Sequence, residues 1–538
     1  MKLSLLLFVL PLAAQPPSKY LAAVREFADH ALKHGRDVYD SRHTPLFVDG
    51  LNVDTLQPVT WISTNGAEWV LSNLGNQQVF FRTLDGLSSL TGDARYRQAA
   101  IDATLYAYKN LDWGGLLYWG GHAAYNATAD TFFFSEDKGK SHELKEHFPH
   151  YDLMWKADPA RTRVLIESIW NDHVLDWSKL DFNRHGSPRP MGRLWKNEFL
   201  NTPVFFWGKG LTFVNAGSDL YLAAAMLSHL DSNPEALAWA RRLALRYVET
   251  RNPKTGIGGY QFSQTNAWCD GVGKILGDRA QYQYAESFPG HHVVEGTLFP
   301  CYGDAPGVNP QLCQMAIAER LGPAGADFRR WAIEELTAWA KSAYRASDNT
   351  FIPMLTDGAS MEGFVVKKDG YFGPKGRVLR AGKARPSHFW AYAEAWRQSS
   401  DALMWDMARR IAQANGYGDI DGKLEVHTTV SDAGALFGFL ALYRKTQKRG
   451  FLEMAARIGD NILAAHFVKG FFVRSANHVN AKFDAVEPLA LLHLEAARQG
   501  RPNAVPVFHG TGAFFAAAYA NKGHQYDSSI LYGRGRKE

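Results

Sequence analysis

The chain has 538 residues, a net charge of +5 and 46% hydrophobic residues, so it can bury a large core. Three cysteines are too few for a disulfide-stabilised scaffold. The basic residues form neither long runs nor a nucleic-acid-binding motif, and no nucleic-acid partner is expected.

The N-terminus has the layout of a short signal peptide. An apolar run at 3–12 follows Lys2 and leads into Ala13 and Ala14. This run is too short to cross a bilayer, and no later run reaches transmembrane length. We therefore expect residues 1–14 to be a signal peptide, the mature protein to be secreted or periplasmic, and no membrane span.

Most of the remaining chain has the pattern of helices separated by short breaks rich in Gly, Asp, Asn or Pro. The recurring unit is an apolar helix, a break and a second, amphipathic helix, with examples at 80–111, 220–250, 314–344 and 436–467. Such hairpins cannot bury their apolar faces alone, so they must stack as an open solenoid or a closed toroid. The aromatic content of 13% favours the toroid. We predict an all-α fold, an α/α toroid in the form of an incomplete α/α barrel of helical hairpins, with residues 15–538 forming one catalytic domain.

One segment breaks the helical rhythm. At 363–380, Val365-Val366 and Val378-Leu379 stand on either side of Gly-rich turns. This pattern predicts a small β-hairpin inserted over the helical body.

Two segments, 180–210 and 367–385, are locally basic. A solvated loop is the usual structure for either segment. Together, however, they suit an anionic polymer that is held by ammonium and guanidinium groups. The side chains that we select as candidate substrate contacts are Arg189, Arg193, Lys209, Lys367 and Lys368.

Potential metal ligands are concentrated between Trp113 and Gly217. A search of this region for a metal site selects His122, Glu143 and His185. Two imidazoles and one carboxylate suit a first-row divalent cation that keeps open coordination positions for a substrate.

A local helical hairpin supports the proximity of two of these ligands. Asp158 is a good N-cap, and the apolar face that follows it predicts a helix to about Trp177. If this helix pairs antiparallel with a shorter one at 149–155, Glu143 before the hairpin and His185 after it emerge at the same end.

With these residues in place, the sequence resembles the family 2 polysaccharide lyases, the pectate lyases built on an α/α barrel. Their metal-binding His and Glu and their adjacent Arg-His pair match His122, Glu143, Arg184 and His185 in both order and spacing. The resemblance is good over residues 113–217, and beyond that range it rests on the helical rhythm.

The resemblance implies a divalent cation at His122, Glu143 and His185, most commonly Mn²⁺, with Ca²⁺, Ni²⁺ and Co²⁺ as alternatives. It also implies that Arg184 removes the substrate proton. The expected function is metal-assisted β-elimination of an acidic uronate glycan, pectate or polygalacturonate, which leaves a 4,5-unsaturated uronate end. Because a guanidinium is ordinarily protonated near neutrality, His150 and Lys145 stay open as alternative bases.

Three other functions remain as alternatives. A glycoside hydrolase on the same kind of toroid would use two carboxylates, although no spacing singles out a pair among Asp219, Asp270, Glu286 and Glu295. A sugar isomerase or epimerase would also use histidines. A protein without enzymatic activity would bind acidic glycans through the two basic segments.

Overall fold

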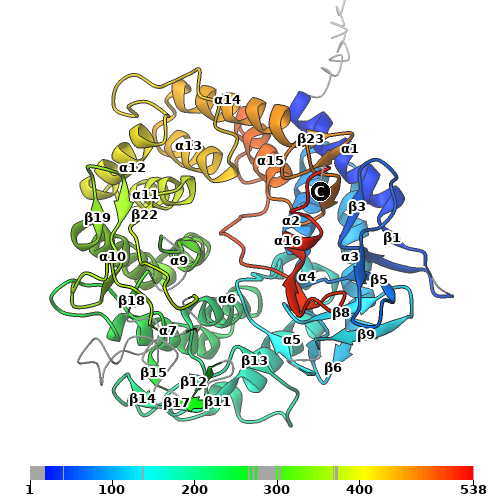
Figure 1. The fold of residues 1–538 in the computed structure, drawn as a ribbon, viewed down its shortest axis with the longest axis horizontal. Coiled ribbons are helices and arrows are strands. Elements are labelled where there is room, and N and C mark those ends of the chain that lie inside the picture. Colours follow the sequence, from blue (N-terminus) through cyan, green and yellow to red (C-terminus); the bar gives the residue numbers. More distant parts are fainter. Residues whose placement is uncertain are drawn as a thin grey trace, which may run out of the picture.

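The helices of the protein form a closed ring, seen from one end in Figure 1. The computed structural model describes residues 18–39, 41–135, 139–264, 267–269, 273–275, 298–300, 305–367, 369 and 373–536. The inner helices, in chain order, are α2 (Gln78–Thr91), α4 (Tyr151–Ala157), α6 (Val214–Asp231), α9 (Asn309–Leu321), α11 (Pro386–Ser399), α13 (Ala433–Thr446) and α15 (Glu487–Arg498).

A second layer of helices covers the outside of the ring. These are α1 (Lys19–His34), α3 (Ala94–Asn110), α5 (Pro159–His173), α7 (Pro234–Glu249), α10 (Ala326–Ser342), α12 (Ala402–Ala414) and α14 (Arg449–His466). The inner helix α6 is buried on every face between Ala216 and Leu227. The outer helix α7 buries one stripe, including Ala236, Trp239 and Leu243. An apolar helix next to an amphipathic one is the arrangement that the recurring sequence unit predicted.

The ring closes between the two ends of the helical chain. From α2 to α14, each inner helix pairs with the outer helix that follows it in sequence. The last inner helix, α15, instead packs against α1, the first outer helix, and also against α2 (Figure 1). The fold is therefore the predicted α/α toroid, and contacts of α15, near the end of the chain, with α1 and α2, near its start, close it into a ring.

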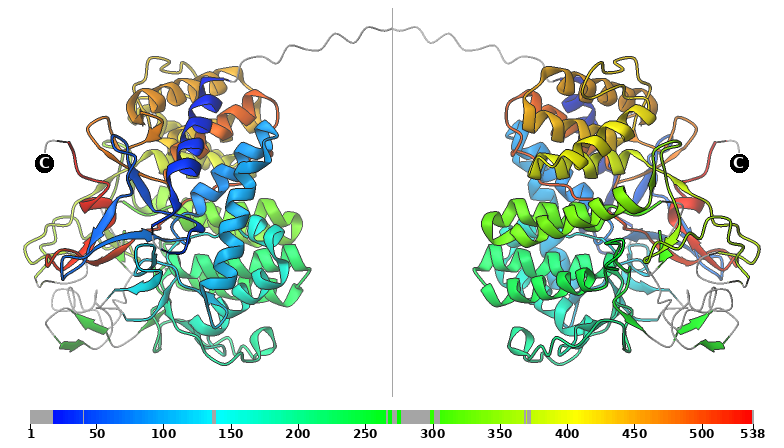
Figure 2. Two further views of the ribbon diagram at one scale, coloured as in Figure 1. Left: turned by 90° about the vertical axis from the view of Figure 1, so that its right-hand side faces the viewer. Right: turned by 90° about the vertical axis from the view of Figure 1, so that its left-hand side faces the viewer.

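The β strands are short and gather on one rim of the ring, as Figure 2 shows. A four-stranded sheet has the order β4-β5-β8-β9, formed by Thr60–Ile62, Glu68–Ser72, Ala123–Asn126 and Thr131–Phe134. Further antiparallel pairs are β3 (Gly50–Asn52) with β25 (Asn480–Lys482), β10 (His142–Glu143) with β13 (His185–Gly186), β11 (Val174–Asp176) with β12 (Asp181–Phe182), and β26 (Ala516–Ala518) with β27 (His524–Tyr526).

The remaining strands form small sheets between helices. They are β1 (Arg36–Asp37) with β2 (Thr44–Phe47), β6 (Asp112–Trp113) with β7 (Leu116–Leu117), β14 (Phe206–Trp207) with β15 (Ser263–Gln264), β16 (Ala267–Cys269) with β17 (Gly273–Ile275), β18 (Leu298–Phe299) with β21 (Met354–Leu355), β23 (Phe467–Val468) with β24 (Phe471–Phe472), and β19 (Tyr344–Arg345), β20 (Thr350–Phe351) and β22 (Gly382–Lys383) in one sheet. A last short helix, α16 (Asp527–Ile530), follows β27.

Two local predictions can be compared with the structure. At the expected β-hairpin, 363–380, Val365 and Val378 form one isolated antiparallel bridge, and the Val366 amide donates to the Arg377 carbonyl over 2.8 Å. Residues 368 and 370–372 of this segment lie outside the described part of the chain. The helix that begins after Asp158 ends at His173 and not at Trp177. It ends early because β11, which starts at the next residue, pairs with β12.

Some expectations concern residues outside the described part of the chain. The signal peptide at 1–14, the candidate contact Lys368, and the acidic residues Asp270, Glu286 and Glu295 all lie there. Within the described part, no helix combines the length and the apolar character that crossing a bilayer requires.

Candidate metal centre and active site

The pairing of β10 with β13 places Glu143 beside His185. The two residues are direct partners in this antiparallel pair, and the Leu144 amide donates to the Arg184 carbonyl over 2.9 Å. Partners in such a pair carry side chains on the same face of the ribbon. Glu143 and His185 are 42 positions apart in the sequence, and the strand pairing makes them neighbours.

His122 reaches the same place from the loop before β8. The loop can approach Glu143 closely because it contains Gly120 and Gly121. A Cβ atom at Gly121 would lie 2.2 Å from Glu143 Oε2 and 2.6 Å from the Phe514 ring. No side chain fits in that space, so the glycine is needed here for close approach.

His122, Glu143 and His185 form one compact cluster. Each offers one potential ligand atom, and these atoms all lie within 4.8 Å of one another. Glu143 Oε2 is 3.6 Å from His122 Nε2, and Glu143 Oε1 is 3.5 Å from His185 Nε2. Glu143 is fully buried, whereas the His185 side chain is 23% exposed. The cluster is therefore buried on the Glu143 side and accessible to solvent on the His185 side.

Hydrogen bonding fixes the orientation of the His122 ring. Its Nδ1 lies 2.9 Å from the carbonyl oxygen of Ala516, which can only accept, so Nδ1 carries the proton. Burial lowers the pKa of His122, which favours the neutral ring. The unprotonated Nε2 then faces the Glu143 carboxylate.

His122 Nε2 and the Glu143 carboxylate both offer lone pairs and face each other in a buried site. This arrangement suits a cation between them. The nearest donors to the Glu143 carboxylate, His185 Nε2 at 3.5 Å and Arg184 Nε at 3.6 Å, lie farther away than the donors of ordinary hydrogen bonds. A buried carboxylate without such bonds is costly unless positive charge compensates it. The three side chains therefore fit a divalent cation, with a backbone carbonyl orienting one imidazole as is usual for metal-bound histidine.

The electrostatics of the cluster keep Glu143 ionised. Burial alone would raise the pKa of Glu143, but His185, Arg184 and His122 together hold it below its usual range. The Arg184 Nε lies 3.6 Å from Glu143 Oε1, and the Arg184 side chain is 14% exposed. The structure therefore brings all four residues of the predicted constellation into one site.

Further side chains surround this site. Lys145 is half-buried, and its Nζ lies 4.3 Å from the centre of the Phe514 ring. Burial, followed by the charge of Arg184, lowers the pKa of Lys145. The exposed ring of His524 lies 5.5 Å from that of His122, centre to centre. Sequence reasoning named Lys145 but missed Phe514 and His524, which lie far along the chain without a motif.

A cavity of about 480 Å³ lies beside Lys145. Its other lining residues include Asn309, Arg251, Glu335 and Arg385. Arg251 and Glu335 form an ion pair of 2.9 Å, and the other charged side chains of the lining are Lys145, Glu146 and Arg385. The volume is within the range of small-molecule sites.

The basic side chains selected as substrate contacts lie on exposed loops. Arg193, Lys209 and Lys367 are exposed. Arg189 is tied to the end of α5, since its guanidinium donates to the Val174 carbonyl over 2.9 Å and to the Asn171 carbonyl. Its charge therefore already compensates the helix C-terminus.

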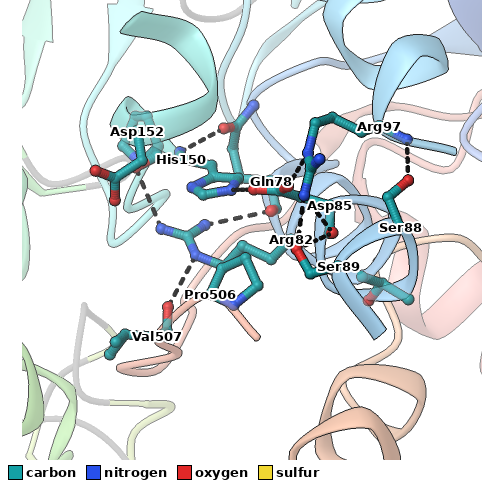
Figure 3. A network of polar contacts seen from close by, with 12 residues as sticks. Gln78, Arg82, Asp85, Ser88, Ser89, Arg97, His150, Asp152, Pro506 and Val507 are labelled. Carbon is teal, nitrogen blue, oxygen red and sulfur yellow. Dashed lines mark hydrogen bonds and ion pairs between the residues drawn. The ribbon is translucent and has the colours of Figure 1, made fainter. Parts of the chain in front are cut away.

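His150, an alternative base in the sequence analysis, belongs to a separate buried network (Figure 3). Its Nε2 lies 2.9 Å from Asp85 Oδ2, and its side chain is 3% exposed. Asp85 is also paired with Arg97, while Arg82 Nε donates to the Val507 carbonyl over 3.1 Å. This network joins α2, the start of α4 and the C-terminal segment, which indicates a structural role for His150.

Asp219, a candidate hydrolase acid, also has structural contacts. It is buried on α6, and its Oδ1 accepts a hydrogen bond of 3.0 Å from the Phe148 amide. Phe148 and Glu146 both have positive φ angles, 44° and 54°. Asp219 therefore stabilises the strained turn that follows Glu143 and Lys145.

Comparison with known proteins identifies the family. The model of the periplasmic pectate lyases matches residues 44–518. A pectate disaccharide-lyase of Dickeya dadantii is 30% identical over 548 residues, covering 96% of each chain. Among solved structures, a D-mannose isomerase shares 11% identity over 90% of this chain and all of its own, with a TM-score of 0.45. A family 76 α-mannanase of Bacteroides thetaiotaomicron shares 10% identity over 90% of this chain and 97% of its own, with a TM-score of 0.42. On the sequence matches, the chain is a polysaccharide lyase and belongs to the periplasmic pectate lyase family.

Proposed function

We propose that the protein cleaves pectate by metal-assisted β-elimination at the cluster of His122, Glu143, His185 and Arg184. The observation that carries this proposal is the convergence of three ligand atoms within 4.8 Å of one another, around a buried carboxylate. A basic rim consisting of Arg184 and Lys145 adjoins these ligands and suits a uronate carboxylate.

The chemistry requires removal of the proton at C5 of the uronate. This proton is acidic because C5 lies next to the carboxylate. The base takes the proton, the released electron pair forms the C4–C5 double bond, and the bond from C4 to the glycosidic oxygen breaks. The leaving oxygen gains a proton, and the new chain end is a 4,5-unsaturated uronate.

The side chains have separate tasks in this reaction. When bound, a divalent cation at His122, Glu143 and His185 supplies charge that stabilises the carboxylate as electrons move onto it. Arg184 removes the C5 proton. A guanidinium is ordinarily protonated, and its neutral form is favoured by burial and by positive charge nearby. Lys145 orients the substrate carboxylate and is the alternative base.

Mn²⁺ is the cation that we propose first. Imidazole and carboxylate ligands together suit manganese and its neighbours in the first transition row, so Ni²⁺ and Co²⁺ are the next candidates. Ca²⁺ is a weaker candidate because it prefers oxygen ligands.

The substrate that we propose is polygalacturonate or its oligosaccharides. The Dickeya relative is named as a pectate disaccharide-lyase, so an unsaturated disaccharide is the product to look for first. We also propose that the exposed Arg193, Lys209 and Lys367 contact longer chains. Charge reversal at each residue should raise KM for the polymer more than for a trimer, and equal changes for both substrates would argue against such contacts.

The proposed location is the periplasm or the cell exterior after removal of residues 1–14. The family is described as periplasmic. Mass spectrometry of the mature protein from its host should show an N-terminus near Gln15. An intact Met1 in exported protein would contradict the signal peptide.

The decisive experiment follows the absorbance of unsaturated uronate at ultraviolet wavelengths. Metal-stripped protein is mixed with polygalacturonate, with and without Mn²⁺, and Glu143→Gln serves as the matched variant. A lyase gives the ultraviolet signal only with the cation, and Glu143→Gln gives none. A hydrolase would release reducing ends without the signal, and a binding protein would produce neither.

A further inference from the structure

The ligand His122 is held by a segment at the far end of the chain. Its Nδ1 donates to the carbonyl of Ala516, 394 residues away, over 2.9 Å. The Ala516 amide in turn donates to the Gly121 carbonyl over 2.7 Å. Ala516 of β26 therefore holds the loop that carries His122 through two hydrogen bonds, one to its carbonyl and one from its amide.

The position of Ala516 depends on Asp527, at the start of α16. Asp527 Oδ1 accepts from the Phe515 amide at 3.2 Å and from the Ser528 amide at 2.8 Å. The Asp527 amide donates to the Phe515 carbonyl over 3.0 Å. These bonds close the β26–β27 hairpin directly next to Ala516, so they fix where its carbonyl points.

Asp527 itself is anchored by a buried ion pair. Its side chain is 3% exposed, and its Oδ2 lies 3.1 Å from Lys482 Nζ on β25. The same ammonium group lies 2.8 Å from Asp484 Oδ2. A buried carboxylate between a cation and two amide donors has one preferred position, which makes it a precise support.

We infer that Asp527 is a positioning residue for the candidate metal centre, acting on His122 through the Phe515–Ala516 backbone. This inference rests on the proposed function. Metal-bound histidine commonly donates its second ring nitrogen to a carbonyl or carboxylate, and losing such outer partners weakens metal binding by about 10- to 100-fold. Asp527 lies beyond residue 518, where the family match ends.

The test compares Mn²⁺ affinity of metal-stripped, full-length variants by electron paramagnetic resonance. Asp527→Ala removes the acceptor and the charge, and should weaken Mn²⁺ binding by about 10- to 100-fold. Asp527→Asn keeps an acceptor oxygen and should show a smaller loss in the same direction. Excess Mn²⁺ should restore turnover in both variants, because the ligands themselves are intact.

Asp432→Ala is the matched control for a purely structural effect. Asp432 accepts from the Gly434 amide over 2.7 Å and from the Ala435 amide at the start of α13, so its hydrogen bonds to described residues lie within that helix end. This variant should lose thermal stability and keep the Mn²⁺ affinity of the wild type.

Each outcome bears on a different claim. Wild-type affinity in either soluble Asp527 variant would overturn the positioning role, while the proposed function would stand. Absence of Mn²⁺ binding and of turnover in the wild-type protein would instead overturn the proposed function. If Asp527→Ala does not fold, the result for Asp527→Asn decides the question.

Discussion

Glu143 lies directly opposite His185 in the pairing of β10 with β13, and its carboxylate is fully buried 3.5 Å from the His185 ring nitrogen. This contact joins two parts of the chain that are separated by the α4–α5 hairpin. The candidate metal centre therefore depends on a strand pair of only two residues on each side.

Glu143→Gln should abolish the stabilisation of the protein by Mn²⁺. A ligand at 100 times its Kd stabilises a folded protein by about 2.7 kcal/mol, and this gain should be present in the wild type and absent from the variant. The metal-free variant should be less stable than metal-free wild type, because it loses the attraction between the ionised Glu143 and Arg184 Nε 3.6 Å away. Thermal unfolding with and without Mn²⁺ measures both effects. Equal metal-induced stabilisation in the two proteins would remove Glu143 from the ligand set.

Arg184→Ala should lower kcat by about 100- to 10,000-fold, the usual contribution of a general base. Mn²⁺ affinity should stay the same or increase, because a positive group 3.6 Å from Glu143 Oε1 has been removed. Steady-state kinetics and metal titration on the same preparation separate the two effects. Lys145→Met is the comparison variant: if it shows the larger loss of kcat, Lys145 is the base.

Asp219→Asn should change how stability depends on pH. Burial raises the pKa of Asp219 to about 7, so in wild type the stability that the protonated carboxyl contributes at pH 4 is lost as the pH rises through 7. Each tenfold difference in proton affinity between the folded and unfolded states is worth about 1.4 kcal/mol. The variant cannot ionise, so its stability relative to wild type should rise between pH 4 and 7 and then level off. Urea unfolding at several pH values measures this, with exposed Asp421→Asn as control, and a pH-independent difference would contradict the assignment.

His150→Ala should destabilise the fold without affecting the metal centre. It leaves Asp85 Oδ2 without its 2.9 Å partner in a buried network, a loss of about 1–3 kcal/mol. Mn²⁺ affinity and kcat should stay at wild-type values. Exposed His43→Ala is the control for stability. A large fall in kcat in a folded His150→Ala protein would revive His150 as a base.

The helical ring could be predicted because its signal is repeated along the chain. The inner helix α6 is apolar on all faces and the outer helix α7 on one, and this alternation is visible in the residues themselves. Caps such as Asp158, which accepts from the Arg161 amide over 3.0 Å, fix where helices start.

The site could be predicted only in part. The ligand types and their order are sequence features, but the pairing of His142–Glu143 with His185–Gly186 is too short to give an alternating pattern. The Ala516 carbonyl that orients His122 has no side-chain signature at all. Arg189 illustrates the opposite difficulty: its charge suggested a substrate contact, whereas its guanidinium binds the carbonyl of Val174.

The packing of α15 against α1 has a consequence for the order of folding. The first helix described in the chain has its partner near the other end, so synthesis must be almost complete before that apolar face is covered. Contacts between such distant segments form slowly, because a long loop must close before they stabilise anything. Completion of the ring is therefore a late event, and a chain truncated before Glu487 would expose apolar surface on its first helix.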